Sequence, residues 1–366
     1  MWRRILALAT KEFLAILKDP RSRAVVILPP IIQTLVFGYA ATFDLNHVAY
    51  AVYDADRSTI SRELVERFRG SPVFLEKKVI TAAGDIAPTV DRRDALLIVR
   101  LDQGFARDIL AGRPGQVQLI IDGRNSNTAL IVLNYAREVI NGFALERQHG
   151  AALPGQPVVR AWFNPNLESR WFIVPGIIGL LTLMVTMMVT ALSVSREREQ
   201  GTFDQLLVTP LRPMDILVGK SLPGLAIGFV EATIMVLIVT LWFGVPLRGS
   251  LWTFYIGLGA FLTSAIGIGL MISSLSITMQ QGLLGAFLFM VPAILLSGFA
   301  TPIANMPEWL QTLTLGNPLR YFMVILRGVF VEGASLRVLW PQIWPMLLIG
   351  SLTLVAAGRL FRHRLY

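Results

Sequence analysis

The chain has 366 residues, of which 54% are hydrophobic and only 16% are charged, and its formal net charge is +9. About a quarter of the residues of a typical soluble domain are charged, so this composition excludes a soluble globular protein, and the clustered apolar residues exclude disorder, collagen and coiled coil. The absence of cysteine and the three scattered histidines, His47, His149 and His363, exclude disulfides, a thiol nucleophile and a Cys or His metal cluster. We attribute the net positive charge to basic residues that flank the membrane spans on the cytoplasmic side, and we expect no nucleic-acid partner.

Six apolar stretches are long enough to cross a bilayer, which takes about 20 residues. The fourth and fifth come from one run, 249–307, of 59 residues without Lys, Arg, Asp or Glu. Its polar midpoint, 273–281, predicts a loop between two spans. The predicted spans are 24–43, 171–195, 221–243, 252–273, 281–300 and 338–358. The sequence therefore predicts a polytopic α-helical membrane protein with six transmembrane helices.

The segment 301–337, between the fifth and sixth spans, is only partly polar and contains Pro302, Pro307 and Pro318. These prolines break any continuous helix, and non-helical backbone at membrane depth persists only where protein or water covers it. We predict that this segment consists of half-helices that enter the outer leaflet near the exit of a pathway.

The basic residues beside the predicted spans gather on one side of the membrane if both termini are cytoplasmic. Thirteen Lys and Arg residues then fall on that side, in 1–23, 196–220 and 359–366, and four in the short loops opposite. Because cytoplasmic loops carry the excess of Lys and Arg, we predict that both termini are cytoplasmic.

The first eighteen residues predict an amphipathic helix. Arg3, Arg4, Lys11 and Lys18 lie on one face. We expect segment 1–23 to begin with a helix at the membrane surface; the alternative is a soluble helix packed on a partner. The predicted apolar face consists of Trp2, Ile5, Leu6, Ala9, Phe13, Ile16 and Leu17.

Residues 44–170 differ from the rest, with sixteen Lys or Arg and fifteen Asp or Glu. Strand-like and helix-like patterns alternate there, which predicts a small mixed α/β domain, inserted outside the membrane between the first two spans. A linker is expected at 151–165. The polar turn 122–127 predicts either a ligand site or a cap for the next helix, and we favour the cap. The predicted strands are 48–53, 73–75, 95–99 and 117–121, and the predicted helices are 58–69, 103–110 and 128–148.

Motifs of enzyme chemistry are missing from the sequence. It contains no Walker A sequence, no His-Glu-x-x-His and no Gly-x-Ser-x-Gly. Glu231 is the only Asp, Glu, Lys or Arg in the predicted spans, and one carboxylate supplies neither a nucleophile with its base nor a metal site. We predict that the chain is not an enzyme. Glu231 either contacts a cationic substrate or a proton, or is a protonated carboxyl bonded to a neighbouring helix.

The segment Ser195 to Lys220, SREREQGTFDQLLVTPLRPMDILVGK, closely resembles the coupling loop of ABC-2 type transporter permeases. The likeness covers nearly the whole chain in matching order and is weakest in the α/β insert. It looks like the subgroup with a large extracytoplasmic domain, which includes proteins implicated in drug efflux. Further matching motifs are 11–13, 18–20, 244–249, 269–276, 296–303, 305–310, 317–322 and 326–328.

This resemblance implies the membrane subunit of an exporter in the inner membrane of a bacterium, moving a drug-like or amphipathic substrate. It implies no cofactor in this chain, ATP and Mg on separate ATPase partners, a second permease copy (identical or paralogous) and the lipid bilayer; a periplasmic adaptor also fits. The rival function is an ATP-independent scaffold or receptor whose soluble domain binds an envelope partner.

The resemblance also implies two sets of site residues. The segment 202–208 is predicted to project an apolar knob into the ATPase. The predicted ATPase-coupling residues are Glu197, Glu199, Gly201, Thr202, Phe203, Leu206, Leu207, Thr209 and Pro210. The predicted pathway residues are Glu231, Pro302, Asn317, Pro318, Arg320 and Arg327.

Overall fold

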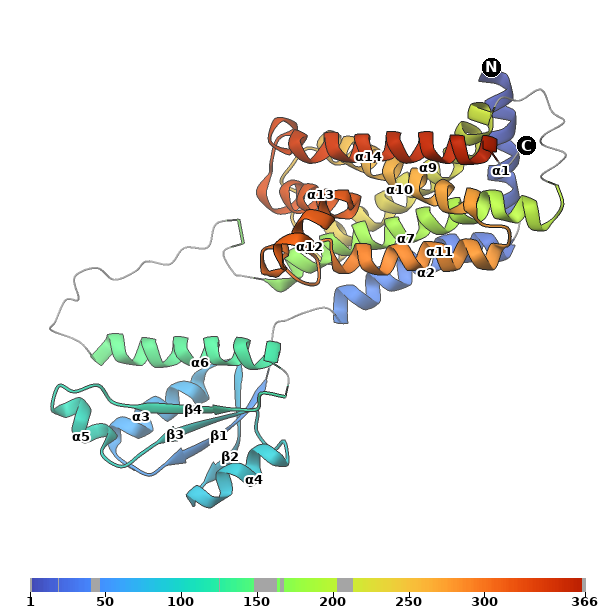
Figure 1. Cartoon of the computed structure of the whole chain (residues 1–366). Helices are drawn as coiled ribbons and strands as arrows, with labels where there is room; N and C mark the ends of the chain where they lie inside the picture. The colour runs from blue at the N-terminus through green and yellow to red at the C-terminus, as the bar shows by residue number, and fades with distance from the viewer. Residues whose placement is uncertain are drawn as a thin grey trace. The chain divides into compact units, whose positions relative to one another are not determined.

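The computed structural model of the chain describes residues 2–18, 20–40, 47–124, 126–147, 163–164, 168–202 and 213–363. The chain divides into two compact units (Figure 1). The α/β unit is Thr42–Arg160, and the helical unit consists of Met1–Ala41 and Ala161–Tyr366. The predicted linker 151–165 lies outside the described residues except for Phe163 and Asn164.

The α/β unit is built on a four-stranded mixed sheet in the order β2-β1-β3-β4. The central strand β1 runs parallel to β2 and β3, and β3 pairs antiparallel with β4. All four predicted strands and the three predicted helices are present. The strands are β1 Val48–Asp54, β2 Phe74–Ile80, β3 Leu97–Leu101 and β4 Val117–Ile121; the helices are α3 Thr59–Gly70, the 3-10 turn η1 Ala83–Asp85, α4 Ile86–Asp91, α5 Phe105–Leu110 and α6 Ser126–Arg147. The short segments η1 and α4 were not predicted.

Alternating residues of the sheet face two separate cores, as the two-residue period of a strand requires. Tyr50 and Val99 are buried against α3, α5 and α6, whereas Ala51 and Ile98 are buried on the other face beside α4. In the polar turn, the Asp122 carboxylate accepts hydrogen bonds from the backbone and guanidinium of Arg124. Arg124 in turn donates to the Val90 carbonyl at 2.7 Å, so the turn is tied to α4.

The helical unit contains long helices that run side by side and a broken segment between α11 and α14 (Figure 1). Within the described residues, four helical stretches are long and apolar enough to cross a membrane: Ser169–Glu199, Asp215–Trp242, Leu251–Leu275 and Leu336–Phe361. The other two predicted spans correspond to shorter apolar helical stretches, Leu28–Tyr39 and Met279–Leu295. The count of six spans therefore stays a prediction.

Several helices of this unit begin or end a few residues away from the apolar runs that predicted them. The elements are α1 Trp2–Lys18, α2 Pro20–Ala40, α7 Ser169–Glu199, α9 Pro213–Leu237 with a π-helical turn η2 Ile238–Trp242, α10 Leu251–Leu275, α11 Met279–Leu295, η3 Ile303–Asn305, α12 Glu308–Leu313, η4 Thr314–Gly316, α13 Pro318–Arg327, a π-helical turn η5 Gly328–Glu332 and α14 Leu336–His363.

Two predicted boundaries differ from the structure. The predicted loop 196–220 is shorter, because α7 continues to Glu199 and α9 begins at Pro213. Arg196 and Arg198 in the last turn of α7 suit the negative end of its dipole. The fifth predicted span, 281–300, ends early because α11 stops at Leu295 and Gly298 has a left-handed φ of +80°.

The core of the helical unit centres on α10, which packs against α7, α9, α13 and α14. Phe261 of α10 stacks on Phe322 of α13 with ring centroids 4.3 Å apart. A Cβ on Gly267 would lie 3.0 Å from the Gly350 carbonyl, so this glycine permits close approach of α10 and α14. Segment 301–337 is broken as its prolines predicted; its position in the outer leaflet stays a prediction.

The helix α1 is present as predicted, but it packs on its own chain. Ile5 and Leu8 are buried, and a Cβ on Gly219 of α9 would lie 2.7 Å from the Leu8 side chain. Ile5 therefore faces the protein, although the sequence placed it in the membrane-facing stripe. Leu6 and Phe13 of that stripe remain exposed.

Candidate coupling site at the ends of α7 and α9

The end of α7 is fixed by a hydrogen-bonded glycine cap. Gly201 has φ +67°, and its N–H donates to the Arg198 carbonyl at 3.1 Å. The Thr202 N–H donates to the Glu197 carbonyl at 3.0 Å. This pair of bonds is the Schellman motif, which needs a left-handed residue after the helix. Thr202, one of the predicted coupling residues, therefore closes α7, a role that the sequence analysis missed.

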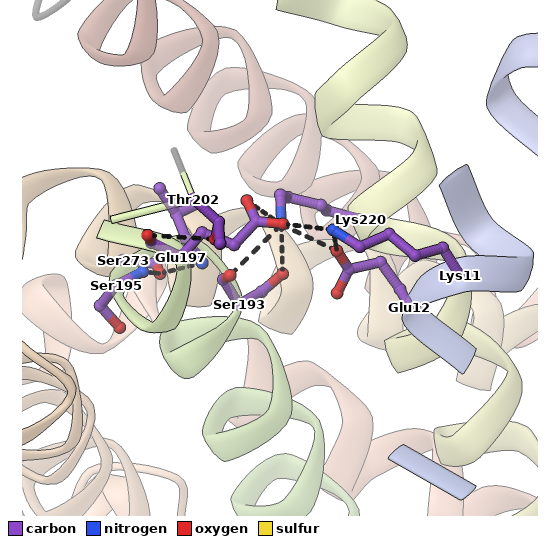
Figure 2. Close-up of polar contacts among 9 residues, drawn as sticks. Lys11, Glu12, Ser193, Ser195, Glu197, Thr202, Lys220 and Ser273 are labelled. Atoms are coloured by element: carbon purple, nitrogen blue, oxygen red, sulfur yellow. Dashed lines mark hydrogen bonds and ion pairs between the residues drawn. The ribbon is translucent and has the colours of Figure 1, made fainter. Parts of the chain in front are cut away.

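Next to this cap, four charged residues from three helices meet, and we call them the charge cluster (Figure 2): Lys11 and Glu12 of α1, Glu197 of α7 and Lys220 of α9. The Lys220 side chain is 0% exposed, and its Nζ lies 2.8 Å from Glu197 Oε2 and 3.1 Å from Glu12 Oε1. It also donates to the Ser193 carbonyl at 3.2 Å. Lys11 Nζ donates to Glu197 Oε1 at 3.0 Å.

The charge cluster contains two cations and two anions, so its formal charge is zero. This matters because a buried ion is strongly destabilising unless it is paired and hydrogen-bonded. Burial opposes the charged form of Lys11, but the hydrogen bond and charge of Glu197, together with Glu12, outweigh this effect and raise the pKa of Lys11. The cluster thus ties α1 to the two helices that flank residues 203–212, which lie outside the described residues.

Residues at the end of α7 also form hydrogen bonds with the loop between α10 and α11. Arg198 donates to the carbonyls of Ser274 and Ser276 at 2.9 and 3.0 Å. The Glu199 carboxylate accepts a bond of 2.6 Å from the N–H of Met279, the first residue of α11. Of the predicted coupling residues, Glu197 and Glu199 therefore link α7 to its neighbours. Phe203, Leu206, Leu207, Thr209 and Pro210 lie outside the described residues.

Two of the predicted pathway residues, Asn317 and Arg320, hold the broken segment together. The Asn317 side chain accepts from the Leu319 N–H at 3.1 Å, which caps α13, and donates to the Ala293 carbonyl of α11 at 2.7 Å. Arg320 donates to the Thr314 hydroxyl and to a carbonyl of α12. These contacts are structural links between α11, α12 and α13.

The remaining predicted pathway residues do not form one site. Arg327 donates to the Gly298 carbonyl at 3.1 Å and lies 4.0 Å from the ring centroid of Phe172. Pro318 is the first residue of α13, and Pro302 precedes η3. Glu231 lies instead on α9 and is 6% exposed.

A sequence model of the ABC-2 family transporter proteins matches residues 23–359. The chain belongs to this family. Over the full length of both chains it is 42% identical to the "Probable multidrug ABC transporter permease YbhR" of Escherichia coli K12. It is 30% identical to the "Inner membrane transport permease YhhJ" of the same organism, covering 98% of this chain and 97% of that protein. A third relative, the "Linearmycin resistance permease protein LnrN" of Bacillus subtilis, is 21% identical over 98% of this chain and all of that protein.

In this ABC-2 permease, sequence reasoning predicted a coupling loop at 196–220 but missed the charge cluster beside it. Lys11 and Lys220 were predicted as cytoplasmic basic residues and as parts of matching motifs, and Glu12 only as part of a matching motif; no ion pair among them was predicted. One signal in the sequence was the presence of two carboxylates, Glu12 and Glu197, among apolar and basic residues. A carboxylate beside an apolar helix face needs a cationic partner.

The glycine cap gives a prediction that tests how α7 ends. Gly201→Ala should destabilise the helical unit by about 1–2 kcal/mol, the cost of a left-handed non-glycine residue. A Cβ at this position meets nothing within 4 Å, so backbone strain is the only expected effect. The measurement is the thermal unfolding of the purified permease. Gly316→Ala is the control, because its Cβ is equally unobstructed and Gly316 has no positive φ. Equal melting temperatures for the two variants would contradict the cap.

Proposed function

We propose that this ABC-2 permease is the membrane-spanning subunit of an exporter, which moves drug-like or amphipathic compounds out of the cytoplasm or inner leaflet of a bacterial inner membrane. Separate ATPase subunits that carry ATP and Mg would drive it. The names of two relatives, a probable multidrug permease and a linearmycin resistance permease, support this substrate class.

The observation that carries the proposal is the rigid connection of both ends of the coupling loop. Glu197 precedes the loop and Lys220 follows it, and their side chains lie 2.8 Å apart. A force applied to residues 203–210 would therefore move α7 and α9 together. The contacts of Arg198 and Glu199 would pass the same movement to α10 and α11.

The proposed cycle requires partners. Closure of the ATPase dimer would press on the apolar side chains of Phe203, Leu206 and Leu207 and open a pathway between two permease copies, identical or paralogous. The α/β unit would lie outside the membrane, where a periplasmic adaptor is a further candidate partner.

Orientation in the membrane is a testable part of this proposal. A cysteine introduced at Ser126, in a chain that has none of its own, should react with an impermeant maleimide on spheroplasts. A cysteine at Thr209 should react only after lysis. The reversed labelling pattern would place the α/β unit inside the cell and would contradict the coupling assignment.

The test of function is purification of the permease with its ATPase, followed by ATP hydrolysis measurements in lipid vesicles with candidate compounds. We expect the ATPase to co-purify and amphipathic compounds to raise its turnover and to accumulate inside inverted vesicles. If the permease is isolated without an ATPase while its α/β unit retains an envelope protein, the scaffold function replaces the exporter.

A further inference from the structure

Glu231 carries a carboxyl group that is buried inside the helical unit. Its residue is 6% exposed, and neither of its carboxyl oxygens makes a hydrogen bond within the part of the chain that the structure describes. Buried polar groups in proteins are nearly always hydrogen-bonded, so such an exception calls for an explanation.

Two hydroxyl groups on α7 share this property. Thr182 and Thr186 are fully buried, and their Oγ1 atoms also lack a partner among the described residues. Threonines inside helices commonly donate to the carbonyl four residues earlier. Thr190, one turn further along α7, does so, bonding the Thr186 carbonyl at 2.7 Å. The hydroxyls of Thr182 and Thr186 are therefore free to bond a group on another helix.

The register in which α7 packs against α9 places Glu231 and the two threonine hydroxyls at the same height along the helix pair. A Cβ on Gly224 would lie 2.9 Å from Thr190, and a Cβ on Gly228 would lie 3.0 Å from Thr186 Oγ1. The two residue numbers of each pair have the same sum, as expected for antiparallel helices, in which a step forward along α9 matches a step back along α7. The same spacing places Glu231, one turn beyond Gly228, opposite residues 182 and 183.

The helices packed against α9 offer no counter-charge at this level. The stretches 171–195 of α7 and 251–275 of α10 contain no Lys, Arg, Asp, Glu or His. Lys220, in the charge cluster, lies eleven residues before Glu231, about 16 Å along the helix. Two further titratable groups on these helices are hydrogen-bonded phenols, Tyr39 of α2 (accepting from Trp242) and Tyr255 of α10 (with Thr233). The charged residues of α1 include Lys11 and Glu12 of the charge cluster. The remaining titratable groups lie near helix ends: Arg21 and Arg23 of α2, Arg170, Arg196, Glu197, Arg198 and Glu199 of α7, Asp215 of α9, and Arg337, Arg359, Arg362 and His363 of α14.

We propose that Glu231, Thr182 and Thr186 form a proton-binding site between α7 and α9, in which Glu231 is a neutral acid that hydrogen-bonds the threonine hydroxyls directly or through water. The tight packing selects a proton over an organic cation, because even a Cβ on Gly228 would lie 2.5 Å from Leu262. A neutral carboxyl group has an O–H that donates a hydrogen bond and a C=O that accepts one. A threonine hydroxyl can either accept from the O–H or donate to the C=O. An ionised carboxylate in an apolar bundle would require a cation.

This site belongs to the permease alone and does not depend on the proposed export function. The test is infrared difference spectroscopy of the purified permease in lipid at neutral pH, comparing the wild type with Glu231→Gln. We expect a protonated-carboxyl C=O band in the wild type that shifts in D2O and is lost in Glu231→Gln. Absence of this band would show an ionised Glu231 and overturn the proposal.

The threonines are tested with variants of similar volume. In Thr182→Val/Thr186→Val the band should move to higher frequency, because the C=O group loses hydrogen-bond donors. Thr190→Val is the matched control and should leave the band unchanged, since that hydroxyl bonds its own helix. If the double variant does not fold, the two single variants replace it. A band unaffected by all threonine changes would overturn the three-residue site.

Discussion

Lys220→Met is expected to destabilise the helical unit by about 3–5 kcal/mol, because Glu12 and Glu197 are then left with Lys11 as the one cation of the charge cluster, and an uncompensated buried charge is costly. Lys220 is fully buried between Glu12 and Glu197, and Met keeps most of its length. The loss should appear as a lower melting temperature of the purified permease and as weaker stimulation of the ATPase by substrate. Lys18→Met, on the exposed surface of α1, is the control and should change little.

A double variant distinguishes the contribution of the buried charges to stability from that of side-chain packing. In Lys220→Met/Glu197→Leu, two opposite charges are removed together, and Lys11 and Glu12 remain 3.8 Å apart as a pair. Replacing a buried ion pair by apolar residues is often neutral or stabilising, so the double variant should be more stable than Lys220→Met alone. Equal melting temperatures for Lys220→Met and the wild type would contradict the view that the charge cluster holds α1, α7 and α9 together.

Leu206→Asp should abolish binding of the ATPase while the permease still inserts and dimerises. If Leu206 enters an apolar groove on the ATPase, the aspartate must be buried there without a partner, at several kcal/mol. Since each 1.4 kcal/mol changes affinity about tenfold, we expect at least a hundredfold weaker complex and no transport. The measurement is the amount of ATPase bound per folded permease.

The control for this experiment is Leu206→Met, which keeps an apolar side chain of similar volume and should bind normally. An ordinary loop gives a different result. In that case Leu206→Asp would lower expression or thermal stability, and the surviving protein would retain a normal ratio of ATPase to permease. That outcome would refute the apolar knob and leave the charge cluster unaffected.

The sequence by itself determined the elements and the family. Long apolar runs locate α7, α9, α10 and α14, and short apolar runs in the insert locate all four strands, because both signals are local in the sequence. The order of motifs around the coupling loop identified the ABC-2 family. The predicted helix ends were less exact, because a helix can continue through charged residues. Arg196 and Arg198 still belong to α7, although the apolar run ends before them.

Only the tertiary structure decided which polar groups meet. Glu12 and Lys220 are separated by 208 positions, and counting basic residues predicts a side of the membrane for Lys220 but not its partners. Likewise, the sequence singled out Glu231 as the lone charge within the predicted spans, but not Thr182 and Thr186, which our proposal places opposite it. The register of α7 on α9 is fixed by close contacts at Gly224 and Gly228. Such contacts depend on the packing of whole helices, which no local pattern contains.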